Sequence, residues 1–424
     1  MRLLPLIFSN ATALPVRLVP RKSIDSQRLT DEKLNVPISV TFIIPSLGSG
    51  GAEGMLYRLL SRLDRTRFTA KVISLIDLGP TANVKKIQAL GVPIRFLGMQ
   101  PGRPNPIALL RLARWLREDP PDLISTWQYH ADLIGGVAAR LAGSIPVAWG
   151  IRQSDLSREG NKRLTLLTAR MCAGLSRWLP RKIICCSEAS QQVHAALGYA
   201  AEKMVVIPNG YDLGTFRPDS AAREAIREEL RIPEDAPVIG LVGRFHPQKD
   251  HCNFIWAAGS LHKDRPGVYF VLCGQDVNWE NAELTRWIDE AGIRKMIYPL
   301  GRRDDIPQIT AAFDIACLSS FTEGFPNIVS EAMSCEVPCV VTDVGDAAQI
   351  VGQTGLVVPP RNPAALAAAL RKMVDLGREG RNQLGRAARQ RITEQFDLPQ
   401  IVARYESLFQ ELAPVRRPLS ATCP

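Results

Sequence analysis

VTFIIPSLGSGGA, residues 40–52, joins a run of apolar and β-branched residues to a glycine-rich turn. The apolar run predicts a buried strand, and the stretch after the turn, Ala52–Leu63, predicts a helix. Glycines at such a junction allow the backbone to approach a ligand such as a phosphate closely, although a flexible turn would have the same composition. The unit predicts the start of a parallel sheet with a ligand at its edge.

The same alternation of strand and helix continues along the chain and restarts once. Further strands of the first set are predicted at 71–76, 93–97, 122–126, 146–149, 182–186 and 205–208. Those of the second set are predicted at 237–243, 268–274, 296–301, 314–319, 338–342 and 355–358. Near-continuous apolar strands separated by helices are typical of parallel sheets covered on both faces.

We therefore predict an α/β fold with two doubly wound, Rossmann-like parallel-sheet domains that face a cleft. A turn-rich run from Pro208 to Pro218 separates them. The predicted divisions are an N-terminal extension at 1–36, expected to be poorly ordered, a first domain at 37–212, a second at 213–390, and a C-terminal segment at 391–424. The helical stretch Leu384–Leu412 is long enough to cross back to the first domain. Ligands of such sheets bind outside the carboxyl ends of the strands.

Charge is distributed unevenly over the 424 residues. The net charge is +10, with +13 in residues 1–212 and −3 in the remainder. A basic half favours an anionic partner, although a solvated basic surface explains it equally well. No zinc-finger, helix-turn-helix or RNA-binding signature accompanies the charge, so we expect no nucleic acid and consider an anionic membrane surface instead. No run of 18 apolar residues predicts a transmembrane helix. The nine scattered cysteines predict reduced thiols rather than a zinc site.

The most informative segment is SSFTEGFPNIVSEA, residues 319–332. Glu323 follows a predicted strand, Gly324 permits a sharp turn, and Pro326 suits the first turn of a helix. The amino end of a helix exposes unpaired N–H groups that bind phosphates or hydroxyls. Glu323 and Glu331 therefore predict a site for hydroxyl groups of a sugar and a ribose; surface acids near a helix start are the plainer interpretation.

A second segment, Gly243-Arg244 followed by Lys249, ends the first strand of the second domain. Two cations at the carboxyl edge of a sheet suit a diphosphate on which negative charge builds. In the first domain, His130 and Asp132 follow the strand at 122–126, and Arg152 follows the strand at 146–149. We expect His130 in the cleft and interpret Arg152 and Asp132 as candidates for acceptor binding, with diphosphate binding as the alternative for Arg152.

Several signatures are missing from the sequence. There is no Asp-x-Asp pair for Mg²⁺, and HExxH, P-loop and Gly-x-Ser-x-Gly motifs are also absent. Charge compensation is therefore expected from Arg244, Lys249 and backbone dipoles, with no metal and no cofactor.

Taken together, these segments resemble family 4 of the glycosyltransferases, which have the GT-B fold. The resemblance covers about residues 38–412. It rests on Glu323 and Glu331, the Gly-Arg…Lys element, the linker 206–212, the turn 50–53, and the stretches 343–346 and 354–357. The stretch Trp127–Gly136 resembles members that build bacterial surface polysaccharides on lipid carriers.

The resemblance implies a role for each candidate residue. The second domain would bind a nucleotide-sugar: Arg244 and Lys249 would hold the diphosphate, Glu331 the ribose, and Glu323 the donor sugar. The remaining implied donor contacts are Gly51, Gly301, Arg302, Gly324, Phe325, Pro326 and Asn327, with Gly301 and Arg302 near the base. His130 would lie near the transferred sugar. The basic helix at 161–182 would contact the inner leaflet of a cell membrane, which implies a cytoplasmic, peripheral protein; a buried helix with a solvated basic edge is the alternative.

The function expected from the resemblance is retaining, metal-independent transfer of a hexose-type sugar. The donor would be a nucleotide-sugar, with UDP favoured, and the acceptor a hydroxyl of a lipid-linked or saccharide molecule. A sugar-nucleotide epimerase of the same fold would convert the donor without an acceptor, and a non-catalytic sugar-nucleotide sensor would only bind it. An NAD-dependent dehydrogenase is disfavoured because the first turn lacks Gly-x-Gly-x-x-Gly.

Overall fold

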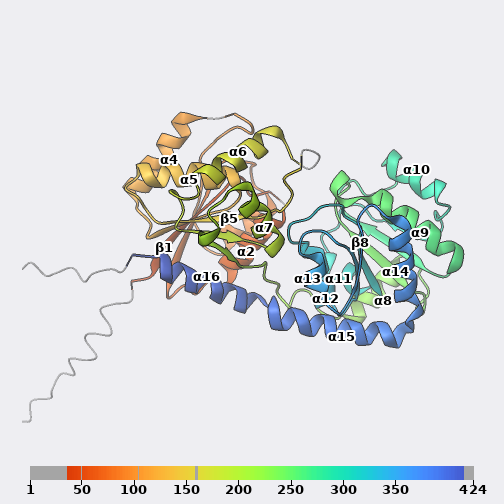
Figure 1. The fold of residues 1–424 in the computed structure, drawn as a ribbon. Coiled ribbons are helices and arrows are strands. Elements are labelled where there is room, and N and C mark those ends of the chain that lie inside the picture. Colours follow the sequence, from red (N-terminus) through yellow and green to blue (C-terminus); the bar gives the residue numbers. More distant parts are fainter. Residues whose placement is uncertain (1–35, 49, 104, 158–160, 415–424) are drawn as a thin grey trace, which may run out of the picture. The chain divides into compact units, whose positions relative to one another are not determined.

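Two parallel sheets organise the chain in the computed structural model, which describes residues 36–48, 50–103, 105–157 and 161–414 (Figure 1). The first sheet has the strand order β3-β2-β1-β4-β5-β6-β7, and the second has β10-β9-β8-β11-β12-β13. In each sheet the order reverses beside the first strand, which defines a doubly wound fold. Each strand overlaps a segment predicted from the sequence, so the predicted α/β fold with two such sheets is confirmed.

The strands are short and parallel throughout the described residues. The first sheet contains β1 (Ile38–Ile44), β2 (Phe68–Ser74), β3 (Ile94–Phe96), β4 (Leu123–Thr126), β5 (Val147–Ile151), β6 (Lys182–Cys185) and β7 (Met204–Val206). The second contains β8 (Val238–Val242), β9 (Tyr269–Cys273), β10 (Ile297–Pro299), β11 (Ile315–Leu318), β12 (Cys339–Thr342) and β13 (Leu356–Val358).

Helices cover both faces of the first sheet. They are α2 (Gly51–Arg62), α3 (Ala82–Ala89), α4 (Pro106–Glu118), α5 (Tyr129–Leu141), α6 (Arg163–Leu175) and α7 (Glu188–Leu197). One core joins the sheet to α2 and α3, and a second joins it to α4, α5 and α6. This two-sided burial explains why its strands are apolar along their whole length.

The second sheet is covered in the same way. Its helices are α8 (Ser220–Glu229), α9 (His251–Asp264), α10 (Ala282–Glu290), α11 (Ile306–Ala311), α12 (Asn327–Ser334), α13 (Ala347–Val351) and α14 (Pro363–Asp375). Helices α9, α10 and α14 share one core, whereas α8, α11, α12 and α13 pack in the other. The strand order reverses between β8 and β11. The helices that follow these two strands, α9 and α12, begin at the carboxyl edge of the sheet.

The last helical stretch returns to the first sheet, as predicted, but it is broken. Helix α15 (Gly377–Gln395) packs with the second sheet, and α16 (Leu398–Leu412) packs in the core of the first, where Phe409 meets Phe42 edge-on at 5.9 Å. The predicted helical stretch over 384–412 is helical except at residues 396–397, which separate α15 from α16. Between the two helices, Tyr211 N–H donates to Phe396 O (2.9 Å) and Leu398 N–H donates to Tyr211 O (3.0 Å). At the break, these hydrogen bonds to Tyr211 of the linker take the place of hydrogen bonds within a helix.

Other predictions concern cysteines, membrane spans and the termini. The cysteines of the described chain are free, and all but Cys252 are buried. No helix in the described residues has the length and apolar character needed to cross a membrane. Residues 1–35 of the predicted extension and the tail 415–424 lie outside the described residues.

Candidate functional site

Lys249 and Glu323 form an ion pair beside the carboxyl ends of β8 and β11. Lys249 ends the short 3-10 turn η2 (Pro247–Lys249), and its Nζ donates to Glu323 Oε1 at 2.6 Å. Ser320 Oγ donates to the same oxygen at 2.7 Å. The two charged side chains keep 25% and 15% of their surface exposed. Because an ammonium group has three donors, Lys249 can bind a second anion while it holds Glu323.

Glu331 lies on α12, close to the same lysine. Arg58 of α2 approaches it, with Nη1 at 3.7 Å from Glu331 Oε1. Burial raises the pKa of Glu331 above its ordinary value, and the positive charges of Arg58 and Lys249 oppose that rise. The structure therefore brings Lys249, Glu323 and Glu331 into one cluster, as the sequence predicted.

Arg244 is placed differently from Lys249. Its side chain is exposed, and no hydrogen bond or ion pair connects it to another described residue. The preceding Gly243 packs against the lysine stem: a Cβ added there would lie 3.4 Å from Lys249 Cδ. Arg244 thus follows a residue that packs against Lys249, but its side chain has no ion pair with Glu323 or Glu331.

Asn327, at the start of α12, connects the two halves of the described chain. Its Oδ1 accepts hydrogen bonds from Asn209 Nδ2 at 2.9 Å and from the Tyr211 hydroxyl at 2.6 Å. The turn before α2 touches the same side chain, because a Cβ added at Gly51 would lie 2.6 Å from Asn327 Nδ2. Two of the predicted donor residues, Gly51 and Asn327, are therefore neighbours.

The loop between Glu323 and α12 is tightly held. A Cβ added at Gly324 would lie 3.0 Å from Gln153 Cα, and Gly324 O accepts the Asp346 N–H at 3.1 Å. Phe325 is buried and stacks on Tyr211, with ring centroids 6.4 Å apart. Pro326 is buried as the residue before α12. The side chain of Phe325 belongs to the core, so only its backbone is left to face a donor.

His130 and Asp132 both lie in the first two turns of α5, but in different surroundings. His130 is half-buried, and burial lowers its pKa. Asp132 is fully buried; its Oδ1 accepts bonds from Thr126 Oγ1 and the Gly150 N–H, and burial raises its pKa to about 7. This placement contradicts the prediction that Asp132 contacts an acceptor. Its bonds instead fix the ends of β4 and β5.

Arg152 follows β5 and is held by aromatic groups. Its guanidinium carbon lies 3.6 Å from the Trp127 ring centroid, and Nη2 donates to the Tyr405 hydroxyl of α16 at 2.6 Å. Nε and Nη1 are buried and have no hydrogen-bond partner among the described residues. Arg152 Nε and Nη1 thus lie buried and unpaired among the described residues, beside the loop of Gly324, whose added Cβ would lie 3.3 Å from Arg152 O.

Gly301, predicted to lie near the base of the donor, has both of its backbone polar groups in hydrogen bonds within the chain. Gly301 has φ of +70°, in the left-handed region that favours glycine, and is buried. Its N–H donates to Val277 O at 2.7 Å, and its carbonyl accepts the Gly274 N–H at 2.9 Å. Gly301 therefore closes a loop with both backbone groups. The side chain of Arg302 is exposed.

Sequence reasoning missed the residues that hold this region together. Arg58 faces Glu331, Asn209 and Tyr211 bind Asn327, and the Asp346 carboxylate accepts the N–H groups of Glu188 and Ala189 at 3.0 Å each. Burial raises the pKa of Asp346, against those two bonds. Asn209, Tyr211 and Asp346 stand in stretches that supported the resemblance, so a signal existed. Arg58 has none, because it is an ordinary helix cation in sequence.

The sequence matches two families of glycosyltransferase domains. Residues 49–215 match Glycosyltransferase Family 4, and residues 222–391 match Glycosyl transferases group 1. The UDP-Gal:alpha-D-GlcNAc-diphosphoundecaprenol alpha-1,3-galactosyltransferase of Escherichia coli is 28% identical over 56% of this chain. The alignment spans 62% of that enzyme, less than two thirds of its length. The putative glycosyltransferase EpsF of Bacillus subtilis (strain 168) is 27% identical over 72% of this chain and 79% of its own.

The fold is also similar to solved structures. The Anabaena protein Alr3699/HepE, crystallised in complex with UDP, superposes with a TM-score of 0.78 at 24% sequence identity, over 88% of this chain and 100% of that one. At this identity the likeness concerns the fold, and it confirms the predicted GT-B architecture. Because the two domain matches together cover most of the sequence, the chain belongs to the glycosyltransferases, with a family 4 domain followed by a group 1 domain.

Proposed function

We propose that this chain is a retaining, metal-independent glycosyltransferase that moves a hexose-type sugar from a UDP-sugar to a hydroxyl group of a lipid-linked or saccharide acceptor. The observation that carries the proposal is the 2.6 Å pair of Lys249 and Glu323 beside the amino end of α12. The names of two similar proteins support the donor and acceptor classes: the E. coli relative uses UDP-Gal and a diphosphoundecaprenol-linked sugar, and HepE binds UDP and UDP-glucose.

Charge compensation comes from this chain's own groups. Negative charge builds on the diphosphate as the glycosidic bond breaks, and preorganised donors stabilise it most effectively. Lys249 has donors beyond the one given to Glu323, Arg244 is exposed nearby in the chain, and the first turn of α12 presents free N–H groups. We therefore expect EDTA to leave the transfer rate unchanged.

Retention of configuration fits the carboxylates of the cluster. A double displacement needs a free carboxylate below the sugar ring. Glu323 instead accepts bonds from Lys249 and Ser320, which suits an acceptor for sugar hydroxyls, and Glu331 suits the ribose. We propose same-face attack, in which the departing phosphate takes the proton of the acceptor hydroxyl. His130, neutral because burial lowers its pKa, would contact the transferred sugar.

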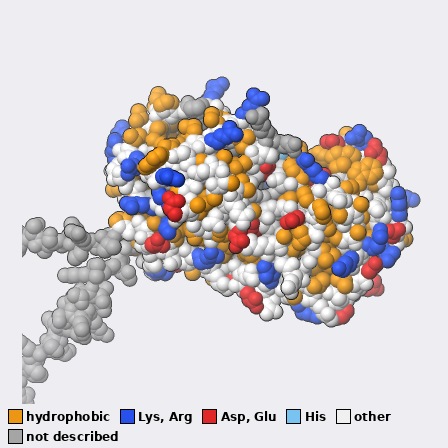
Figure 2. Space-filling model, viewed as in Figure 1, with side chains coloured by type: hydrophobic (Ala, Val, Ile, Leu, Met, Phe, Trp, Pro, Cys, Tyr) orange, Lys and Arg blue, Asp and Glu red, His pale blue; other side chains and the backbone are white. Residues whose placement is uncertain are grey.

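A mixed apolar and basic surface supports contact with a membrane. Helices α4 and α6 both pack on α5. They and the segment after α6 expose the large apolar side chains Ile107, Leu110, Leu164, Leu167, Met171 and Trp178. Exposed basic residues interleave with them: Arg111, Arg114, Lys162, Arg163, Arg170, Arg177 and Arg181. Figure 2 shows hydrophobic and basic side chains together over the α4 region. Such a surface suits the headgroup boundary of an anionic bilayer, near a lipid-linked acceptor.

Vesicle binding tests this α4–α6 surface. The protein is expected to sediment with vesicles of phosphatidylglycerol and phosphatidylethanolamine, and Leu167→Glu should reduce the bound fraction several-fold. The matched control is Leu376→Glu, which changes an exposed leucine after α14. Equal binding of both variants would remove the membrane from the proposal.

One assay separates transfer from its alternatives. The protein is incubated with UDP-glucose, UDP-galactose or UDP-N-acetylglucosamine, with and without a polyprenyl-diphosphate-linked sugar, and UDP and the remaining donor are quantified. UDP release that requires the acceptor supports the proposal. Conversion of the donor into its epimer without an acceptor would identify an epimerase, and binding without turnover across donors and acceptors would identify a sensor.

A further inference from the structure

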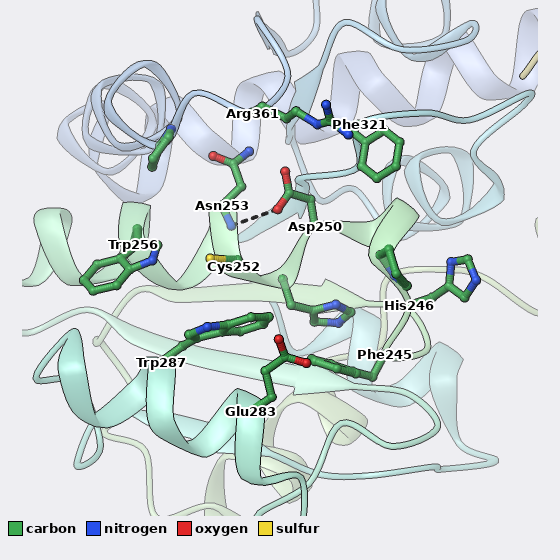
Figure 3. A pocket seen from close by; sticks show the side chains of 13 residues that line it. Phe245, His246, Asp250, Cys252, Asn253, Trp256, Glu283, Trp287, Phe321 and Arg361 are labelled. Carbon is green, nitrogen blue, oxygen red and sulfur yellow. Dashed lines mark hydrogen bonds between the residues drawn. The ribbon is translucent and has the colours of Figure 1, made fainter. Parts of the chain in front are cut away.

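A cavity in the described chain lies beside the Lys249–Glu323 pair, not in it. It measures about 450 Å³, within the usual range of ligand pockets. Its walls come from the loop after β8, the first turns of α9, helix α10, and the segments at Phe321 and Arg361 (Figure 3). Lys249, Glu323 and Glu331 are not among the lining residues, so the proposed donor site does not account for this cavity.

Aromatic rings form much of the wall. Phe245 and Trp287 pack with centroids 5.7 Å apart, and the neutral His251 ring lies 5.3 Å from Phe245. Burial lowers the pKa of His251 to about 4, which leaves no imidazolium cation here. Trp256 projects from α9 and keeps 40% of its surface exposed. The faces of such rings carry partial negative charge and attract C–H groups.

The polar side chains of the cavity include three with hydrogen-bond acceptor oxygens, Asp250, Asn253 and Glu283. Figure 3 shows Asp250 and Asn253 on one side of the first turns of α9 and Glu283 on the other. Asn253 is 4% exposed; its Nδ2 donates to Ser319 O at 3.4 Å, but its Oδ1 is buried without a partner among the described residues. A buried acceptor without a partner is costly, so it indicates a donor supplied from outside the chain.

Rings and acceptors together select the ligand class. A pyranose presents C–H groups on its faces and hydroxyl donors around its rim, which match the indole faces and the oxygens of Asp250, Asn253 and Glu283. A second nucleotide or a phosphate fits less well because two carboxylates face the cavity. Arg361 lies 4.2 Å over the Phe321 ring at the far wall.

We propose that this cavity is a second saccharide-binding site, which holds a neutral part of the growing glycan while the reaction proceeds at the Lys249–Glu323 pair. That the saccharide is the growing glycan rests on the proposed function; the saccharide class rests on the cavity itself. Hydrogen bonds link the segments that form the two sites: Phe321 N–H donates to Gln248 O at 3.0 Å, and the Ser319 side-chain Oγ donates to Lys249 O at 2.7 Å. An extended glycan would thus be held beside the donor site without occupying that site.

Saturation-transfer NMR tests the site on the full chain with UDP present at saturation. The probes are maltotetraose, chitotetraose and β-1,4-galactotetraose, and at least one is expected to give ring-proton signals. Trp256→Ala should weaken its binding about 3- to 10-fold, the worth of one aromatic contact. Trp279→Ala is the matched control, since Trp279 is 42% exposed but lies outside the cavity lining.

The outcomes separate this inference from the proposed function. No signal from any tetrasaccharide, or equal binding by the two tryptophan variants, would overturn the second site even if wild-type protein transfers sugar. Binding that depends on Trp256 in a protein without transferase activity would overturn the proposed function alone. Spermidine binding that depends on Trp256, with no tetrasaccharide signal, would show a cation site and also overturn the inference.

Discussion

The pair of Lys249 and Glu323 allows a sharp test of how the departing charge is stabilised. Lys249 has two separable tasks in our proposal: it positions Glu323 through the 2.6 Å bond, and it neutralises the diphosphate. Lys249→Met removes both tasks and keeps the length of the side chain. Glu323→Gln removes only the carboxylate charge that the lysine holds. A double-mutant cycle of these two changes separates the tasks.

The expected magnitudes differ enough to be measured. The pair is partly exposed, so positioning is worth about 1 kcal/mol, or roughly a fivefold loss of kcat. Loss of a donor to a developing anion costs about 2–4 kcal/mol, up to roughly 10³-fold in kcat. Lys249→Met should therefore lower kcat by about 10²- to 10³-fold in the wild-type background. It should still cause a loss of at least about tenfold in the Glu323→Gln background.

The assay is acceptor-dependent release of UDP at saturating donor, with urea unfolding to verify that each variant is folded. Lys263→Met is the control, because Lys263 is an exposed lysine in the last turn of the adjacent α9. If Lys249→Met has no further effect once Glu323 is Gln, the lysine only positions that side chain. The charge assignment would then be wrong.

Three other changes have defined outcomes. Gly51→Ala should lower kcat at least tenfold, because its Cβ would lie 2.6 Å from an Asn327 amide that cannot move freely. The control is Gly54→Ala on the same helix, where an added Cβ meets open space. This variant should stay active, and its free energy of unfolding in urea should rise by roughly 0.5–1 kcal/mol. Tyr211→Phe should cost about 1 kcal/mol of stability and raise the KM for the donor, because Asn327 loses one of its two donors. The pKa of Asp132 is raised to about 7, so the folded protein keeps a proton that the unfolded chain releases near pH 4. The contribution of Asp132 to stability therefore falls as pH rises from about 4 to 7. In urea unfolding, Asp132→Asn should lack that part of the pH dependence.

The fold was predictable because its signal is local. Each strand is a short run of apolar, often β-branched residues, and burial on both faces makes the run continuous, as in Val40–Ile44. The exception is the break between α15 and α16. It depends on backbone bonds from Tyr211 to Phe396 and Leu398, nearly 200 residues later in the chain, which no local pattern contains.

Much of the candidate site was predictable for the same reason, but its supports were not. Lys249, Glu323 and Glu331 stand where strands end and a helix starts, so topology alone brings them to one edge. Their partners come from distant segments: Asn209 bonds Asn327 across 118 residues, and Arg58 reaches Glu331 from α2, the first helix of the described chain. Side-chain partners so far apart in the sequence are set by tertiary packing. The spacing of residues along the sequence does not predict them.

The two candidates on α5 show how helical geometry could have refined the prediction. Successive residues of a helix are about 100° apart, so His130 and Asp132 point roughly 200° away from each other. Both cannot face the same ligand. Asp132 shares the buried face of the helix with Tyr129, three residues before it, and this leaves His130 on the more open side. Had the apolar face of 129–141 been located first, the sequence would have assigned Asp132 to the interior and kept only His130 for the site.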